Sequence, residues 1–244
     1  MAPPLAHVLP RTHRRTQLLA GLPLGLKTLW GLWLVFALGL ALPTAIAKPG
    51  LPPSLPQNAL AVPNVRQTRD FSCGPAALLA VLRYFGYQVA TETALYRPLG
   101  TTAENGTLPE ALAQGARRFG LKATVRQPMT LAQLRAAVDG GKPVILELQA
   151  WRKPATRHQS WRDTWDDGHY VVLVGVDREY VYLMDPSTEH AYTYLSHDEL
   201  VARWHDVNTR QGVSLRDHRL GVVVWGPQQR PARPRASRGL VKLE

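Results

Sequence analysis

Apolar residues recur at helical spacing through the first half of the chain's central part. The most apolar stretch follows Ser72, a residue suited to cap a helix, has Pro75 in its first turn, and ends at Gly86. Proline is tolerated in a first turn because the N–H group there lacks a helical acceptor. Capping and terminating residues also bracket stretches over 107–119 and 130–138. The pattern predicts a helical N-terminal part built around a central, buried helix.

The second half of this central part changes to short runs of β-branched and aromatic residues bounded by turn residues. Asp177-Arg178-Glu179 joins two of these runs by a connection of hairpin length, which predicts antiparallel pairing. Helices followed by strands indicate an α+β fold with a mainly antiparallel sheet, rather than alternating α/β units. The predicted strands are 143–149, 170–176, 180–184 and 220–225.

The N-terminal segment has the composition of an export signal. Residues 28–47 are uncharged and mostly apolar, and they follow a basic stretch. Small residues at Ala45 and Ala47 match the A-x-A pattern of signal peptidase sites, so cleavage after Ala47 is predicted. An uncleaved signal anchor is the alternative, because about 20 apolar residues also span a bilayer. Either form is exported across the bacterial cytoplasmic membrane, to the periplasm or to an anchored position on the inner membrane.

Proline-rich segments flank the part of the chain that is expected to fold. Residues 48–62 contain four prolines, which extend the chain and oppose a helix. Residues 227–244 combine prolines with arginines and are expected not to pack. The predicted organisation is therefore a signal peptide or anchor over 1–47, a linker over 48–62, one domain over 63–226 and a basic tail over 227–244.

Composition and charge narrow the function classes. Hydrophobic residues make up 45% of the 244 residues and charged residues 19%, which is enough apolar material for a folded core. The formal net charge is +11, but residues 1–47 hold four basic residues and no acid, and residues 230–244 hold five against one. About +3 remains for the middle, and no basic–aromatic recognition motif accompanies it, so no nucleic-acid partner is expected.

Cys73 is the single cysteine, which excludes an intramolecular disulfide and a cysteine-rich zinc site. It is either a small core residue or a nucleophile. Its place at the start of the predicted central helix favours the thiolate, because unpaired N–H groups and the helix dipole stabilise negative charge there. The sequence has no HExxH, EF-hand or phosphate-loop motif, so neither a metal nor another cofactor is expected.

Three polar residues are candidates to act with this thiol. Gln67 precedes Cys73 by six residues, and its amide with the Cys73 N–H can hold a developing oxyanion. His169 opens one predicted strand and Asp185 closes the next. A hairpin turn centred near residue 178 places these two residues close together, so that Asp185 can orient the imidazole that takes the thiol proton.

This constellation resembles the C39 peptidases, papain-like cysteine proteases best known as leader-processing domains of bacteriocin exporters. The resemblance rests on Gln67, on Cys73 followed by Gly-Pro-Ala, on Gly168-His169, and on Asp185 followed by proline. It covers nearly all of the predicted domain and implies a papain-like cysteine peptidase fold. By resemblance, Gln67, Cys73, His169 and Asp185 take the oxyanion, nucleophile, base and orienting roles. Unlike exporter-fused members, this sequence shows no P-loop motif and no multi-span region.

Three tryptophans among four cations lie just before the candidate base, namely Trp151, Trp161 and Trp165. Such amphipathic rings can overhang a cleft and grip an extended peptide substrate. The alternative is a plain loop whose tryptophans pack on the domain.

The function expected from these features is an exported cysteine peptidase. Its partners are a peptide or protein substrate and, through the N-terminal segment, the membrane. Two alternatives stay open. The same residues support acyl transfer to an amine, as in a transamidase, and the fold could serve as a non-catalytic peptide-binding module.

Overall fold

The computed structural model describes residues 54–188, 192–227 and 239–243, so the predicted signal over 1–47 lies outside the described residues. The described part contains a seven-stranded sheet of order β1-β8-β2-β3-β4-β5-β9. Its neighbouring strands run antiparallel except β5 and β9, which are parallel. The strands are β1 (Lys122–Arg126), β2 (Val144–Gln149), β3 (Gly168–Val176), β4 (Tyr180–Met184), β5 (Tyr192–Ser196), β8 (Gly221–Trp225) and β9 (Leu240–Lys242).

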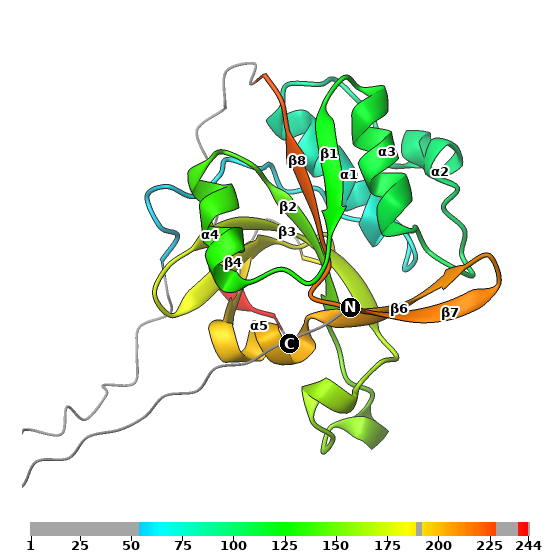
Figure 1. Cartoon of the computed structure of the whole chain (residues 1–244), viewed down its shortest axis with the longest axis vertical. Coiled ribbons are helices and arrows are strands. Elements are labelled where there is room, and N and C mark those ends of the chain that lie inside the picture. Colours follow the sequence, from blue (N-terminus) through cyan, green and yellow to red (C-terminus); the bar gives the residue numbers. More distant parts are fainter. Residues whose placement is uncertain (1–53, 189–191, 228–238, 244) are drawn as a thin grey trace, which may run out of the picture. The chain divides into compact units, whose positions relative to one another are not determined.

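Helices pack on this sheet and enclose the core (Figure 1). They are α1 (Cys73–Tyr84), α2 (Thr93–Leu99), α3 (Pro109–Arg118), α4 (Leu131–Asp139) and α5 (His197–Arg203), with 3-10 turns η1 (Pro154–Thr156) and η2 (Trp161–Asp163). The helix α1 packs on β3 and is buried over ten of its twelve residues. The helix α3 packs on β1 and β8, and α4 on β2 and β3. Every residue of β2 is buried, which requires cover on both faces of the sheet.

The architecture confirms the predicted α+β class, the helical N-terminal part and the mainly antiparallel sheet. The four predicted strands correspond to β2, β3, β4 and β8. The hairpin of β3 and β4 pairs Val172 with Met184. The Asp177 carboxylate closes its turn by accepting the N–H groups of Glu179 at 2.9 Å and Tyr180 at 2.8 Å. The sequence pattern did not predict the strand β1 or the helices α2 and α5. Among the strands after β4 it predicted β8 alone.

A separate two-stranded sheet, β6 (His205–Arg210) and β7 (Val213–His218), forms a hairpin near α3 (Figure 1). Its turn uses Gln211 and Gly212, both with positive φ, as a tight hairpin requires. Arg210 ties the hairpin to α3 through Glu110, at 3.0 Å, and also pairs with Asp217 at 2.7 Å. The hairpin thereby reaches from the sheet toward the helical part.

The packed part of the chain is longer at both ends than the predicted 63–226. Leu60 and Val62 are buried, and the Leu60 N–H donates to Val174 O at 2.7 Å. At the other end, β9 adds to β5, and Leu243 is 2% exposed. Apolar residues within the proline-rich linker and the basic tail therefore contribute to the core. Within the described residues, no helix is both long enough and apolar enough to cross a membrane.

Candidate active site

Cys73 is the first residue of α1 and is partly exposed, whereas the rest of the helix is mostly buried. N–H groups in a first helical turn have no helical acceptor and point toward the residue that begins the helix. The expectation that Ser72 caps this helix with its side chain is wrong. Its hydroxyl bonds instead to the Glu92 carboxylate at 2.7 Å and to Arg69 O at 2.9 Å.

The loop before Cys73 is organised by a buried carboxylate that the sequence patterns did not single out. One oxygen of Glu92, which is 3% exposed, accepts the Thr68 N–H at 2.7 Å and its hydroxyl at 2.8 Å. The same oxygen accepts the hydroxyls of Ser72 at 2.7 Å and Tyr96 at 3.0 Å. Four bonds to one buried oxygen hold the loop and thereby the start of α1.

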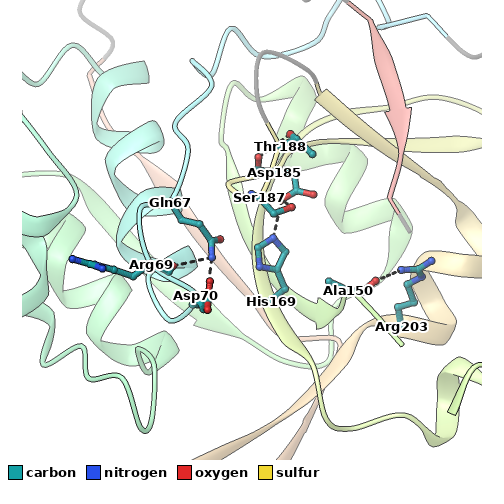
Figure 2. Close-up of polar contacts among 9 residues, drawn as sticks. All are labelled: Gln67, Arg69, Asp70, Ala150, His169, Asp185, Ser187, Thr188 and Arg203. Carbon is teal, nitrogen blue, oxygen red and sulfur yellow. Dashed lines mark hydrogen bonds and ion pairs between the residues drawn. The ribbon is translucent and has the colours of Figure 1, made fainter. Parts of the chain in front are cut away.

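His169 and Asp185 lie together, as the hairpin arithmetic predicts. His169 is the second residue of β3, Asp185 follows β4, and their Nε2 and Oδ1 atoms are 2.8 Å apart (Figure 2). Both residues are 1% exposed. Asp185 Oδ1 also accepts the N–H and the hydroxyl of Ser187, each at 2.8 Å. The carboxylate is therefore held by its own turn while it holds the imidazole.

Electrostatics favour the charged forms of this pair. Burial, the largest influence on His169, lowers its pKa, but hydrogen bonds to Asp185 and to Cys73, with the charges of both, raise the pKa to about 10. Burial raises the pKa of Asp185, yet the His169 bond and charge leave that pKa below its usual value. His169 is thus paired with Asp185 and lines the same cleft as Cys73.

Gln67 lies in the site, but its amide nitrogen is directed at its own loop (Figure 2). Nε2 donates to Arg69 O at 2.9 Å and to Asp70 O at 3.3 Å, while the Gln67 backbone N–H donates to Pro186 O at 2.8 Å. An amide nitrogen carries two hydrogens, so both are engaged in this arrangement. Gln67 therefore braces the loop before Cys73 against the turn after Asp185.

The three tryptophans singled out in the sequence occupy different surroundings. Trp151 lies over the His169 ring, with centroids 4.7 Å apart, and is 39% exposed. Trp165 lines the cleft at Cys73. Trp161 lies between the guanidinium groups of Arg152, at 3.8 Å, and Arg203, at 3.6 Å. Trp165 therefore lines the cleft and Trp151 lies against the ring of its histidine, whereas Trp161 packs its loop onto the domain.

Cys73 and His169 share a cleft of about 620 Å³ with side chains from the helical part, the sheet and the β6–β7 hairpin. Within the described parts of the chain, no three or more His, Cys, Asp or Glu side chains are grouped to hold a metal ion. The remaining residues of the cleft are Asp70, Phe71, Ala103, Glu104, Asn105, Gly106, Thr107, Glu147, Trp165, Asp166, Gly168, Tyr170, Asp206, Val207 and Asn208.

Helices packed on a mainly antiparallel sheet, with Cys73 at the start of the buried helix and His169 near the start of a strand in the same cleft, are the arrangement of a papain-like cysteine peptidase fold. Residues 59–211 match the model of the Peptidase_C39 like family, and the chain belongs to this family. An uncharacterized protein of Methanothermobacter thermautotrophicus is 34% identical over 123 residues, which are 50% of this chain and 70% of that protein.

Two solved structures are similar to this chain at low sequence identity. A Bacillus anthracis protein described as a C39-like peptidase is 19% identical with a TM-score of 0.50, covering 70% of this chain and 98% of that chain. A double glycine motif protease from an AMS/PCAT transporter, solved in complex with the leader peptide, is 20% identical with a TM-score of 0.48, covering 70% and 95%. Family and fold together support a peptidase or a related function.

Proposed function

We propose that this protein is an exported cysteine peptidase that hydrolyses peptide bonds through a thioester on Cys73. The observation that carries the proposal is the position of His169, which pairs with Asp185 at 2.8 Å and shares one cleft with Cys73. A thiol, an imidazole and an orienting carboxylate in this order are the elements of nucleophilic acyl transfer.

In this proposal His169 rests as an imidazolium, since its pKa is raised to about 10, and Cys73 reacts through its sulfur as the thiolate. The sulfur attacks the scissile carbonyl, and the carbonyl π electrons move to its oxygen. The oxyanion lies at the start of α1, where it accepts a hydrogen bond from the Cys73 N–H. The Gln67 amide also donates to the oxyanion, after it gives up its longer hydrogen bond, to Asp70 O.

Collapse of this intermediate breaks the C–N bond, and His169 gives its proton to the leaving amine. Neutral His169 then takes a proton from water, whose oxygen attacks the thioester carbonyl. A second collapse breaks the C–S bond, releases the carboxylic acid product and restores the thiolate–imidazolium pair. Asp185 keeps the imidazole in one orientation throughout, because its own oxygen is fixed by the Ser187 N–H and hydroxyl.

The test uses the full-length protein, purified in detergent, and a mixture of peptides whose cleavage is followed by mass spectrometry. Cys73→Ala and His169→Ala should each lower the cleavage rate at least about 1,000-fold, since both act on the reacting atoms. His158→Ala, on an exposed loop, is the matched control and should cleave at the wild-type rate. Cleavage that persists in Cys73→Ala would refute the mechanism.

The same experiment separates hydrolysis from the two alternatives. With methylamine present, a transamidase yields products that carry the amine, whereas a peptidase yields free carboxylates. Peptides bound but left intact by the wild-type protein would identify a binding module. Export is tested by fractionating cells and sequencing the N-terminus of the recovered protein, which should begin at residue 48 if the signal is cleaved.

A further inference from the structure

The helix that carries the candidate nucleophile and the strand that carries the candidate base meet one residue beyond each of them. Gly74 follows Cys73 in α1, and Tyr170 follows His169 in β3. A Cβ atom placed on Gly74 would lie 3.3 Å from Tyr170 Cδ2. Neighbouring Cα atoms are about 3.8 Å apart along a chain, so this contact is one step from both reacting residues.

Thr107, which lies two residues before α3, closes the same space from another side. The Cβ atom placed on Gly74 would lie 3.0 Å from Thr107 Cβ and 3.1 Å from Thr107 Oγ1. Ordinary contacts between carbon atoms are about 3.5–4.0 Å, so a larger residue at position 74 would have to push Thr107 or Tyr170 away. The start of α1 is therefore seated directly against these two side chains.

Tyr170 is also hydrogen bonded to the residue that faces it across Gly74. Its hydroxyl donates to Thr107 O at 2.9 Å, and the two residues are 4% and 5% exposed. Two backbone hydrogen bonds between Thr102 and Gly106, of 3.0 and 3.1 Å, close the loop that leads to Thr107. Tyr170 therefore joins three segments: its own strand, the start of α1 and the loop before α3.

The strand end that carries Tyr170 is itself held by neighbours on both sides. His169 pairs with Asp185 beyond β4 at 2.8 Å. On β2, the residue opposite Tyr170 is Glu147, which is 3% exposed and accepts Asn208 Nδ2 of the β6–β7 hairpin at 2.8 Å. A side chain on so firmly bonded a strand sets the position of what it packs against.

We propose that Tyr170 is a positioning residue that sets the separation between the Cys73 sulfur and the His169 ring. Gly74 is the second half of this device, because only a residue without a side chain lets the tyrosine ring come so close to α1. The inference rests on the proposed peptidase function, in which the thiol and the imidazole react together. A misplacement of about 1 Å between reacting groups lowers a rate about 100-fold, so the contact has a large effect to exert.

The first arm is a double-mutant cycle on the full-length protein, with alkylation by iodoacetamide followed by mass spectrometry. Cys73 is the single cysteine, so the reagent reports one thiol. At pH 6, His169→Ala should slow alkylation at least about tenfold, because a neighbouring imidazolium favours the thiolate. In the Tyr170→Phe or the Gly74→Ala background, this slowing factor should be at least about threefold smaller, because the imidazole no longer lies in its place beside the sulfur.

Each of these two variants has a matched control away from the cleft. Tyr192 is also 4% exposed, and its hydroxyl donates to a backbone oxygen, Val62 O, at 2.6 Å. A Cβ atom placed on Gly175, near the other end of β3, would meet its nearest atoms at 3.0, 3.3 and 3.3 Å. Tyr192→Phe and Gly175→Ala should therefore keep the wild-type slowing factor. An equal reduction in these controls would mean that loosened packing in general is the cause, and would overturn the proposal.

The cycle separates the positioning role from the peptidase function, and it needs no cleaved substrate. If His169→Ala slows alkylation by the same factor in wild type, Tyr170→Phe and Gly74→Ala, the positioning role is refuted while the thiol and imidazole still act together. If His169→Ala leaves the wild-type rate unchanged, His169 does not activate Cys73 and both proposals fail. Urea unfolding identifies a variant that does not fold, and the other variant with its own control then decides.

A kinetic arm applies to any peptide that the protein cleaves. Gly74→Ala should lower kcat at least about tenfold and leave KM within about twofold, because the added methyl group is buried beneath the substrate cleft and acts only through its neighbours. A raised KM with unchanged kcat would show that Tyr170 and Gly74 act on substrate binding instead, and would overturn the positioning role.

Discussion

Replacing Asp185 by asparagine removes the charge that holds His169 while keeping the size of the side chain. In the wild-type protein the pKa of His169 is raised from its ordinary 6.5 to about 10, with the Asp185 hydrogen bond as the first cause that raises it. One pKa unit corresponds to about 1.4 kcal/mol, so about 5 kcal/mol favours the imidazolium. Asp185 and Cys73 share this stabilisation.

D185N should therefore lower the pKa of His169 by at least about one pH unit. The direction of this change sets the direction in which the pH profile of the activity moves. His169 is an imidazolium below its pKa, and the proposed mechanism needs this form. The kcat/KM of the wild-type protein should therefore fall as the pH rises through about 10, and the kcat/KM of D185N should fall at a lower pH. Stability follows the same sign. The raised pKa stabilises the fold fully below about 6.5, and this contribution is lost as the pH rises through about 10.

The assay is kcat/KM against pH on one cleaved peptide, supported by urea unfolding of both proteins across the same pH range. D198N, which changes an exposed acid in the first turn of α5, is the control and should keep the wild-type profile. If the alkaline limbs of D185N and wild type coincide, Asp185 does not set the charge of His169, and the reasoning fails.

Two further substitutions test the scaffold around the site. Glu92→Gln should lower the free energy of unfolding by about 1–3 kcal/mol, because the four hydrogen bonds of Glu92 hold a buried loop. The same substitution should slow the alkylation of Cys73 by iodoacetamide. An unchanged urea midpoint and an unchanged alkylation rate would contradict this role of Glu92. Gly168→Ala should cost about 1–3 kcal/mol and shift Asp206, because its Cβ would come within 1.8 Å of that carboxylate. A melting temperature equal to that of the wild type would show that the contact is relieved at no cost.

Features carried by local pattern could be predicted from the sequence. The apolar run after Ser72 marks α1, and the hairpin centred near residue 178 places the strand ends that bear His169 and Asp185 together. The observed pairing of Val172 with Met184 agrees closely with that centre, so simple register arithmetic was sufficient. Two neighbouring strands leave little freedom in where their ends meet.

Contacts between distant segments could not be predicted in this way. Glu147 is visible in the sequence as one acid within an apolar strand, but its partner Asn208 lies on a hairpin whose strands are too polar to be recognised by pattern. Likewise, the position of Gln67 suggested an amide that faces the sulfur, whereas loop carbonyls engage its hydrogens. Side-chain direction depends on neighbours that periodicity does not report.

Arg203 connects the segment at Leu243 to the loop beside His169 through hydrogen bonds. Its guanidinium donates to Leu243 O at 3.1 Å and to Ala150 O at 2.8 Å, the carbonyl just before Trp151 (Figure 2). The same group stacks on Trp161, at the far end of the loop that begins there. A chain without Leu243 would lose one of the acceptors of this guanidinium. The guanidinium holds the loop whose Trp151 lies over the ring of His169. The segment at Leu243 is thus a poor place for a deletion or an inserted tag, and a substitution there would act on the site from a distance.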